Sequence, residues 1–207
     1  MIIFPLAAFL LVGLPGAASA PDLPPASEVT LRHQIYRGQG VTAFLLEIPP
    51  GQGSQMHRHD RDLLTIFLTG GRTTAVFEGS APMTDALAAG TVRYRTAGFA
   101  HSTRNDDQIV FRALLLEFDT PQGPRLDGTG PSQTFCTTGF CVDDRIVAAG
   151  TAMGGSGPRL FVPIADVIVR EASGRRHGQA AGTIWAGPGD WTNAGTLPVR
   201  MVSVTFR

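Results

Sequence analysis

The sequence predicts an all-β chain made of two tandem copies of one β domain, each a sandwich or a barrel. Three observations carry this prediction. There are 25 glycines and 15 prolines among 207 residues, spread along the chain. The apolar runs between them are short and rich in β-branched and aromatic residues, and similar blocks recur in both halves. Short apolar runs separated by frequent turn residues are typical of β-sandwiches and barrels.

The first half of the chain contains four clear candidate strands. Each run is bounded by Gly, Pro or Asp, which favours a turn at its end. The candidates are Val41–Ile48, Leu63–Leu68, Thr73–Phe77 and Ile109–Phe118. Only Met83–Ala88 suggests a helical turn, and no segment shows a 3.6-residue apolar period over three turns.

Three blocks of the first half reappear in the same order in the second half, which indicates a duplicated domain. The matches are Gly51 with Gly150, Gly90-Thr91 with Gly182-Thr183 (a match that also places Asn193 opposite His101), and Phe111–Phe118 with Val199–Phe206. We therefore expect a first domain at 21–121, a polar linker at 122–134 and a second domain at 135–207. The second copy has lost the histidines of the first.

The first twenty residues have the composition of a cleaved secretory signal. A continuous apolar segment, Ile2–Leu14, is followed by Ala18-Ser19-Ala20, an A-x-A ending. The segment is too short to span a membrane as a helix. We expect a signal peptide at 1–20, a mature chain from Pro21, a periplasmic or secreted location, and no membrane association after cleavage.

The charge balance and the cysteines limit the partners and the compartment. Seventeen basic residues equal seventeen acidic ones, which removes the electrostatic case for a nucleic-acid partner. The expected partner is a small-molecule ligand, and pairing of two chains as a homodimer stays open. Cys136 and Cys141 would form a small disulfide loop in an oxidising compartment, or remain two separate thiols.

Three histidines form the candidate site. His57 and His59 stand two residues apart, so on a strand both imidazoles point to one face. His101 follows the turn at Thr96–Gly98. Three neutral imidazoles from two strands suit a first-row divalent metal and leave coordination positions open. The alternative is a polar pair on a surface turn.

The spacing of these histidines resembles that of the cupin superfamily. The first cupin motif, G-x5-H-x-H-x3,4-E-x6-G, is similar to Gly51, His57-Arg58-His59 and Gly70-Gly71. The second motif, G-x5-P-x-G-x2-H-x3-N, is similar to Gly90, Thr96, Gly98, His101 and Asn105, with the proline replaced. The resemblance extends over residues 30–118 and covers the second half in outline. It implies a jelly-roll barrel per repeat and a bicupin overall.

The chain departs from the motif at its glutamate. Leu63 and Leu64 occupy the expected positions, and Asp62 is one residue short. Strand alternation from His57 and His59 points Asp62 to the opposite face, so it is a ligand only if a bulge turns it inward. Without it, three neutral ligands leave the metal charge uncompensated, which favours an anionic or chelating substrate.

Two aromatic residues are candidates for the pocket wall. Val92 and Tyr94 share one face of a predicted strand, and the apolar face is expected to point into the barrel, so Tyr94 would line the pocket. Phe99, two residues before His101, would shield the mouth of the site.

Two functions from different classes remain after these steps. In the first, the chain is an exported bicupin that holds Fe, Mn, Ni or Zn through His57, His59 and His101 and acts as a dioxygenase or isomerase on a small molecule. In the second, it is a non-catalytic cupin that binds a small ligand or a protein partner. Hydrolase and nucleotide-binding motifs are absent from the sequence.

Overall fold

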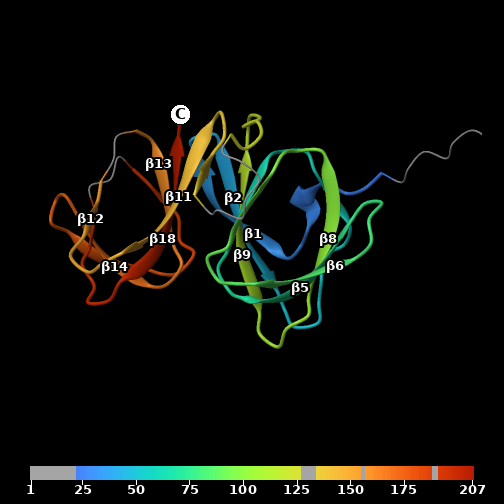
Figure 1. Cartoon of the computed structure of the whole chain (residues 1–207), viewed down its shortest axis with the longest axis horizontal. Coiled ribbons are helices and arrows are strands. Elements are labelled where there is room, and N and C mark those ends of the chain that lie inside the picture. Colours follow the sequence, from blue (N-terminus) through green and yellow to red (C-terminus); the bar gives the residue numbers. More distant parts are fainter. Residues whose placement is uncertain (1–21, 127–133, 155–156, 188–190) are drawn as a thin grey trace, which may run out of the picture.

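The computed structural model of the chain describes residues 22–126, 134–154, 157–187 and 191–207. These residues form two β-barrels side by side (Figure 1), with a single 3-10 turn, η1 (Ala26–Glu28). The all-β, two-barrel prediction is confirmed. The predicted signal peptide, 1–20, lies outside the described residues, as does 127–133 of the predicted linker. None of the described helical segments is long and apolar enough to cross a membrane.

The first barrel consists of two antiparallel sheets. One sheet has the strand order β1-β2-β9-β4-β7 and the other β3-β8-β5-β6. The strands are β1 (Arg32–Gly38), β2 (Val41–Ile48), β3 (His57–His59), β4 (Leu63–Phe67), β5 (Gly71–Phe77), β6 (Met83–Leu87), β7 (Val92–Arg95), β8 (Phe99–Asn105) and β9 (Phe111–Phe118). The predicted helical turn was wrong, because residues 83–87 pair with β5 as an edge strand.

The second barrel repeats this topology strand for strand. Its sheets have the orders β10-β11-β18-β13-β16 and β12-β17-β14-β15. The strands are β10 (Phe135–Cys136), β11 (Phe140–Val147), β12 (Ala152–Met153), β13 (Arg159–Pro163), β14 (Val167–Glu171), β15 (Arg176–Gln179), β16 (Trp185–Ala186), β17 (Trp191–Asn193) and β18 (Val199–Phe206). Cys136 and Cys141 form a disulfide across β10 and β11, so of the two readings of this pair the structure shows the bridge.

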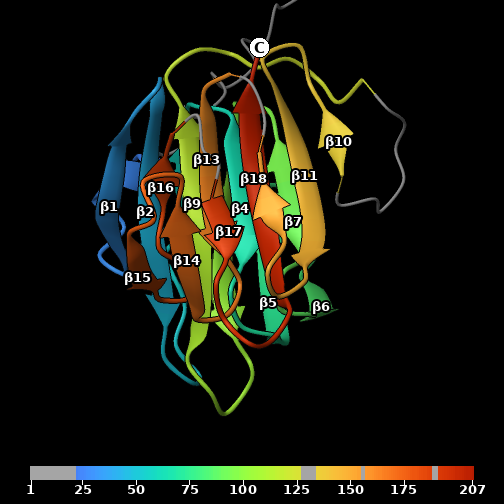
Figure 2. The same cartoon turned by 90° about the vertical axis from the view of Figure 1, so that its left-hand side faces the viewer.

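The five-stranded sheets of the two barrels pack against each other and share one apolar core (Figures 1 and 2). On β9, Leu114, Leu116 and Phe118 point into this shared core, while the alternate residues point into the first barrel. The stacked rings of Phe118 and Phe140, with centroids 4.6 Å apart, join the two halves. Burial on both faces explains why β9 is a continuous apolar run.

The interiors of the two barrels differ. In the second barrel, Trp185, Trp191, Phe161 and Met153 pack together and fill the space with apolar side chains. The first barrel has an apolar cluster around Phe67 and Phe111, and these two residues form part of the wall of a cavity. Trp185 therefore packs against the core of the second barrel, whose described residues hold no counterpart of the three-histidine cluster.

One asparagine in each barrel makes the same pair of side-chain hydrogen bonds, and this pair shows how the two halves of the sequence align. Asn105 Nδ2 donates to the carbonyls of Ile48 and Ile109, and Asn193 Nδ2 donates to those of Val147 and Leu197. Asn193 is thus the counterpart of Asn105, and matching it to His101 was wrong. The second repeat is four residues shorter between its motif glycine and this asparagine, so equal spacing gave a false match. The pairing of Gly51 with Gly150 is confirmed, because each amide donates to the matching asparagine carbonyl.

Candidate metal centre

Strand pairing brings the three histidines together. β3 pairs antiparallel with β8 in a register that sets His57 directly opposite His101, and His59 lies two residues along on the same face. The turn before β8 depends on Gly98, whose φ of 90° disfavours any residue with a Cβ and whose amide donates to the His59 carbonyl. The motif glycine therefore fixes where β8 starts.

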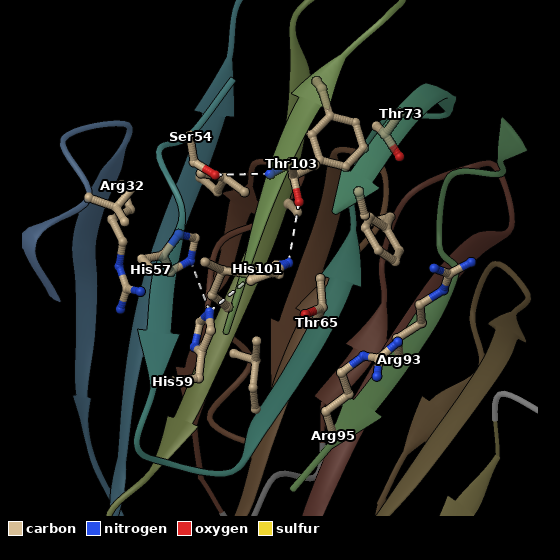
Figure 3. A pocket seen from close by; sticks show the side chains of 18 of the residues that line it. Arg32, Ser54, His57, His59, Thr65, Thr73, Arg93, Arg95, His101 and Thr103 are labelled. Carbon is tan, nitrogen blue, oxygen red and sulfur yellow. Dashed lines mark hydrogen bonds between the residues drawn. The ribbon is translucent and has the colours of Figure 1, made fainter. Parts of the chain in front are cut away.

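The Nε2 atoms of the three rings converge inside the first barrel (Figure 3). His59 Nε2 lies 3.1 Å from His57 Nε2 and 3.2 Å from His101 Nε2. Metal–nitrogen bonds of 2.0–2.1 Å at octahedral or tetrahedral angles place neighbouring ligand nitrogens about 2.8–3.4 Å apart. Two of the three separations fall in this range, and all three ligand atoms lie within 4.8 Å of one another, so the cluster is compact enough for three imidazoles to hold one metal ion.

Burial keeps these imidazoles neutral. Burial lowers the pKa of His59 to about 2, helped by the charges of His101 and His57, and lowers that of His101 to about 3, helped by His57 and Arg95. The pKa of His57 is also lowered by burial. His57 Nδ1 lies 2.8 Å from the Gln55 carbonyl. That carbonyl requires a proton on Nδ1, which leaves the Nε2 lone pair facing the other rings.

A buried ion pair lies behind His59. The Arg32 guanidinium donates to Glu117 Oε1 at 2.6 Å, and both side chains are almost fully buried. The same Oε1 lies 3.8 Å from His59 Nδ1, which has no hydrogen-bond partner among the described residues. A carboxylate behind a ligand histidine is the usual outer-shell arrangement of metal sites, since it fixes the tautomer and the ring orientation.

Aromatic rings flank the histidines on the cavity side. Phe99 stacks on His59 at 4.7 Å between centroids, and Phe77 stacks on His101 at 5.5 Å. Both phenylalanines line a cavity of about 100 Å³ together with the three histidines. A cavity of this volume has room for several waters or a small organic molecule. Phe99, which was expected to shield the mouth of the site, forms part of the cavity wall beside His59.

Asp62 is not part of the histidine cluster. Its buried carboxylate accepts hydrogen bonds from Tyr94 Oη at 2.7 Å, from the Ala97 amide at 2.7 Å and from the Gln122 amide at 2.6 Å. Asp62 lies in the short connection between β3 and β4, which belong to different sheets, and its carboxylate faces these three donors, so the ligand role considered for it is corrected. Asp62 instead ties the turn before β8 to the segment that leaves the first barrel.

Replacing Asp62 with asparagine is expected to lower the free energy of unfolding by about 1.5–3 kcal/mol, because an amide cannot accept at both terminal atoms and the lost bonds involve a charged acceptor. Chemical denaturation measures this change. Asp119→Asn is the control, since Asp119 forms an exposed ion pair with Arg61 and should change stability by less than about 1 kcal/mol. Equal effects of the two variants would show that the Asp62 network is unimportant.

Tyr94 does not line the histidine cavity, and the expectation that it would was wrong. Its ring packs edge-on against Phe140 in the core between the barrels. Burial, and then the Asp62 carboxylate, raises the pKa of Tyr94. Val92 and Tyr94 do share one face of β7, as predicted, but that face points to the core between the barrels. The opposite face, with Arg93 and Arg95, points toward the cavity. The sequence prediction treated the first barrel on its own, and it therefore did not anticipate a second core between the two barrels.

Comparison with known proteins confirms the fold. No family model matches the sequence, and no curated protein sequence matches it. The chain is similar in structure to AerE from Microcystis aeruginosa, with a TM-score of 0.63, 12% identity, and coverage of 86% of this chain and 98% of AerE. It is also similar to a cupin 2 conserved barrel domain protein from Leptotrichia buccalis, with a TM-score of 0.55, 11% identity, and coverage of 87% and 90%.

A third similar structure is an enzyme. A mutant of salicylate 1,2-dioxygenase from Pseudoaminobacter salicylatoxidans gives a TM-score of 0.54 at 12% identity, with coverage of 80% of this chain and 71% of the dioxygenase. At these identities the likeness concerns the fold. The duplicated jelly roll with three histidines inside one barrel has the architecture of a bicupin, and the cupin resemblance seen in the sequence is confirmed at the level of fold.

Proposed function

We propose that this chain binds one divalent first-row metal ion through His57, His59 and His101 and uses it to oxygenate a small organic molecule. The close approach of the three histidines, whose ligand atoms all lie within 4.8 Å of one another, carries this proposal. The chemistry of the donor set supports it as well, because neutral imidazoles are good ligands for Fe, Mn, Ni and Zn.

The surroundings of the histidines support a reaction rather than a purely structural ion. Three ligands leave further coordination positions open, whereas structural sites are closed by four protein ligands. A metal bound here would act as a Lewis acid and an oxygen activator. Glu117 lies behind His59, 3.8 Å from its Nδ1, and the rings of Phe77 and Phe99 stack on His101 and His59 and limit water access to them.

We choose oxygenation over other reactions of cupin enzymes for two reasons: the wall of the cavity is mainly apolar, and a dioxygenase has a similar fold. The cavity is bounded mainly by aromatic and aliphatic side chains, which suits an organic substrate. Salicylate 1,2-dioxygenase shares the fold, and that is a fold-level analogy only. An isomerase at the same site would convert its substrate without consuming oxygen.

Oxygen uptake by the Fe(II)-loaded protein tests this function. We expect uptake with at least one member of a panel of aliphatic and aromatic carboxylic acids, and a rate at least about 100-fold lower for His101→Ala, because removal of a ligand disables the Lewis acid. His33→Ala is the matched control, since His33 is exposed on β1 outside the cavity. Uptake that is unchanged in His101→Ala, or absent with every acid, would contradict an oxygenase.

We also propose that the protein acts after export, as a chain that begins at Pro21. The apolar segment and A-x-A ending of the sequence support this. The Cys136–Cys141 disulfide supports it further, because disulfides persist in oxidising compartments such as the periplasm.

A further inference from the structure

The charged side chains of the cavity wall are paired, with one exception. Arg32, Asp85, Arg93 and Arg95 line the cavity. Arg32 is neutralised by Glu117 at 2.6 Å, and Arg93 by Asp85 at 2.9 Å. Arg95 has no carboxylate within 4.0 Å in the part of the chain that the structure describes. Its positive charge is therefore the uncompensated charge of the wall.

Arg95 lies close to the histidine cluster. Its guanidinium carbon is 4.2 Å from the centroid of the Phe77 ring and 5.8 Å from that of Phe99. These two rings stack on His101 and His59 respectively. Figure 3 shows Arg93 and Arg95 on the far side of the cavity from His57. A molecule of a few carbon atoms that is bound at the histidines could therefore also contact the guanidinium of Arg95.

We propose that Arg95 binds a carboxylate of a small dianionic organic acid whose other oxygen atoms face the three histidines. This proposal rests on the proposed function, because the second binding point is the metal. With no carboxylate among the candidate ligands, a divalent ion keeps its full charge. Together with Arg95 it makes the cavity strongly positive, and a dianion neutralises most of this charge.

The shape of the site narrows the ligand further. A guanidinium binds a carboxylate through two parallel hydrogen bonds, which gives both affinity and orientation. The faces of Phe77 and Phe99 hold the guanidinium in place by cation–π contact, so less freedom is lost on binding. The cavity of about 100 Å³ suits a short aliphatic dicarboxylate or oxo acid between the two points.

Binding of dicarboxylate probes to the Co(II)-loaded protein tests the proposal. The probes are malonate, succinate and 2-oxoglutarate, with succinamide as the uncharged comparison, and calorimetry gives the Kd of each. We expect at least one acid to bind, Arg95→Gln to weaken its binding roughly 10- to 100-fold, and Arg95→Lys to recover part of the loss. Metal stoichiometry should be unchanged, because Arg95 is not a ligand.

The double variant Arg93→Gln/Asp85→Asn is the matched control. It removes a neutral ion pair from the same wall without changing the net charge, and we expect its effect on Kd to be less than about threefold. Equal weakening in this control and in Arg95→Gln would overturn the specific role of Arg95. Binding of succinamide as tight as that of succinate, or no binding of any acid to Co(II)-loaded protein, would overturn the dianion proposal.

The result also separates this inference from the proposed function. A protein that binds no metal but still binds an acid through Arg95 would keep the anion site and contradict the metal site. A metal-loaded protein whose affinity for all probes is independent of Arg95 would leave the metal site intact and overturn the anion site. Failure of both measurements would overturn both.

Discussion

Replacing His59 with alanine is expected to weaken metal binding more than about 100-fold. His59 is the central member of the cluster, with its Nε2 within 3.2 Å of both other Nε2 atoms. Loss of an outer-shell partner alone costs roughly 10- to 100-fold in affinity, and loss of a direct ligand should exceed this. Titration with Co(II) in competition with a chelator gives the two dissociation constants.

The control for this experiment is His33→Ala, which removes an exposed imidazole from the same barrel. Its metal affinity should equal that of the wild type. The far-ultraviolet circular dichroism of His59→Ala should also match the wild type, so that the loss is assigned to the site. Wild-type affinity in His59→Ala would contradict ligation by this residue.

Replacing Phe118 with alanine is expected to destabilise the whole chain by about 3–5 kcal/mol. Phe118 is 1% exposed and stacks on Phe140 of the other barrel, so its truncation leaves a cavity at the centre of the shared core. Because the apolar cluster contains residues of both barrels, both should lose stability together. Thermal or urea unfolding followed by circular dichroism measures the effect.

A double-mutant cycle with Phe140→Ala sharpens this test. We expect an interaction energy of about 0.5–1.5 kcal/mol for the stacked pair. Ile146→Ala is the control, since Ile146 is 73% exposed and should change stability by less than about 0.5 kcal/mol. Two separate transitions, of which Phe118→Ala shifts only the first, would show that the barrels fold as independent units.

The sequence was sufficient for the fold class and for the convergence of the histidines. Residue alternation placed His57 and His59 on one face, and the motif glycines fixed the strand ends that bring His101 opposite them. These features depend on local geometry, which short sequence patterns specify.

What the sequence did not predict depends on contacts between the two barrels. Tyr94 was expected inside the first barrel because apolar faces usually point to the nearest core. A second barrel packed on the outside of the sheet makes that outer face apolar too, and it leaves Arg95 to face the cavity. Glu117 escaped notice for a similar reason, since only the folded structure brings the end of β9 behind His59. For Arg95, a signal was available in the sequence: Arg93 and Arg95 alternate with Val92 and Tyr94 along one strand.

The central claim is that His57, His59 and His101 hold a metal ion, and elemental analysis tests it most directly. The protein from Pro21 to Arg207 would be produced by its own export route, purified without a histidine tag, and compared with His57→Ala/His101→Ala. We predict near-stoichiometric metal in the wild type and almost none in the double variant. Equal metal content in two well-folded proteins, or no metal in the wild type even after reconstitution, would contradict the account.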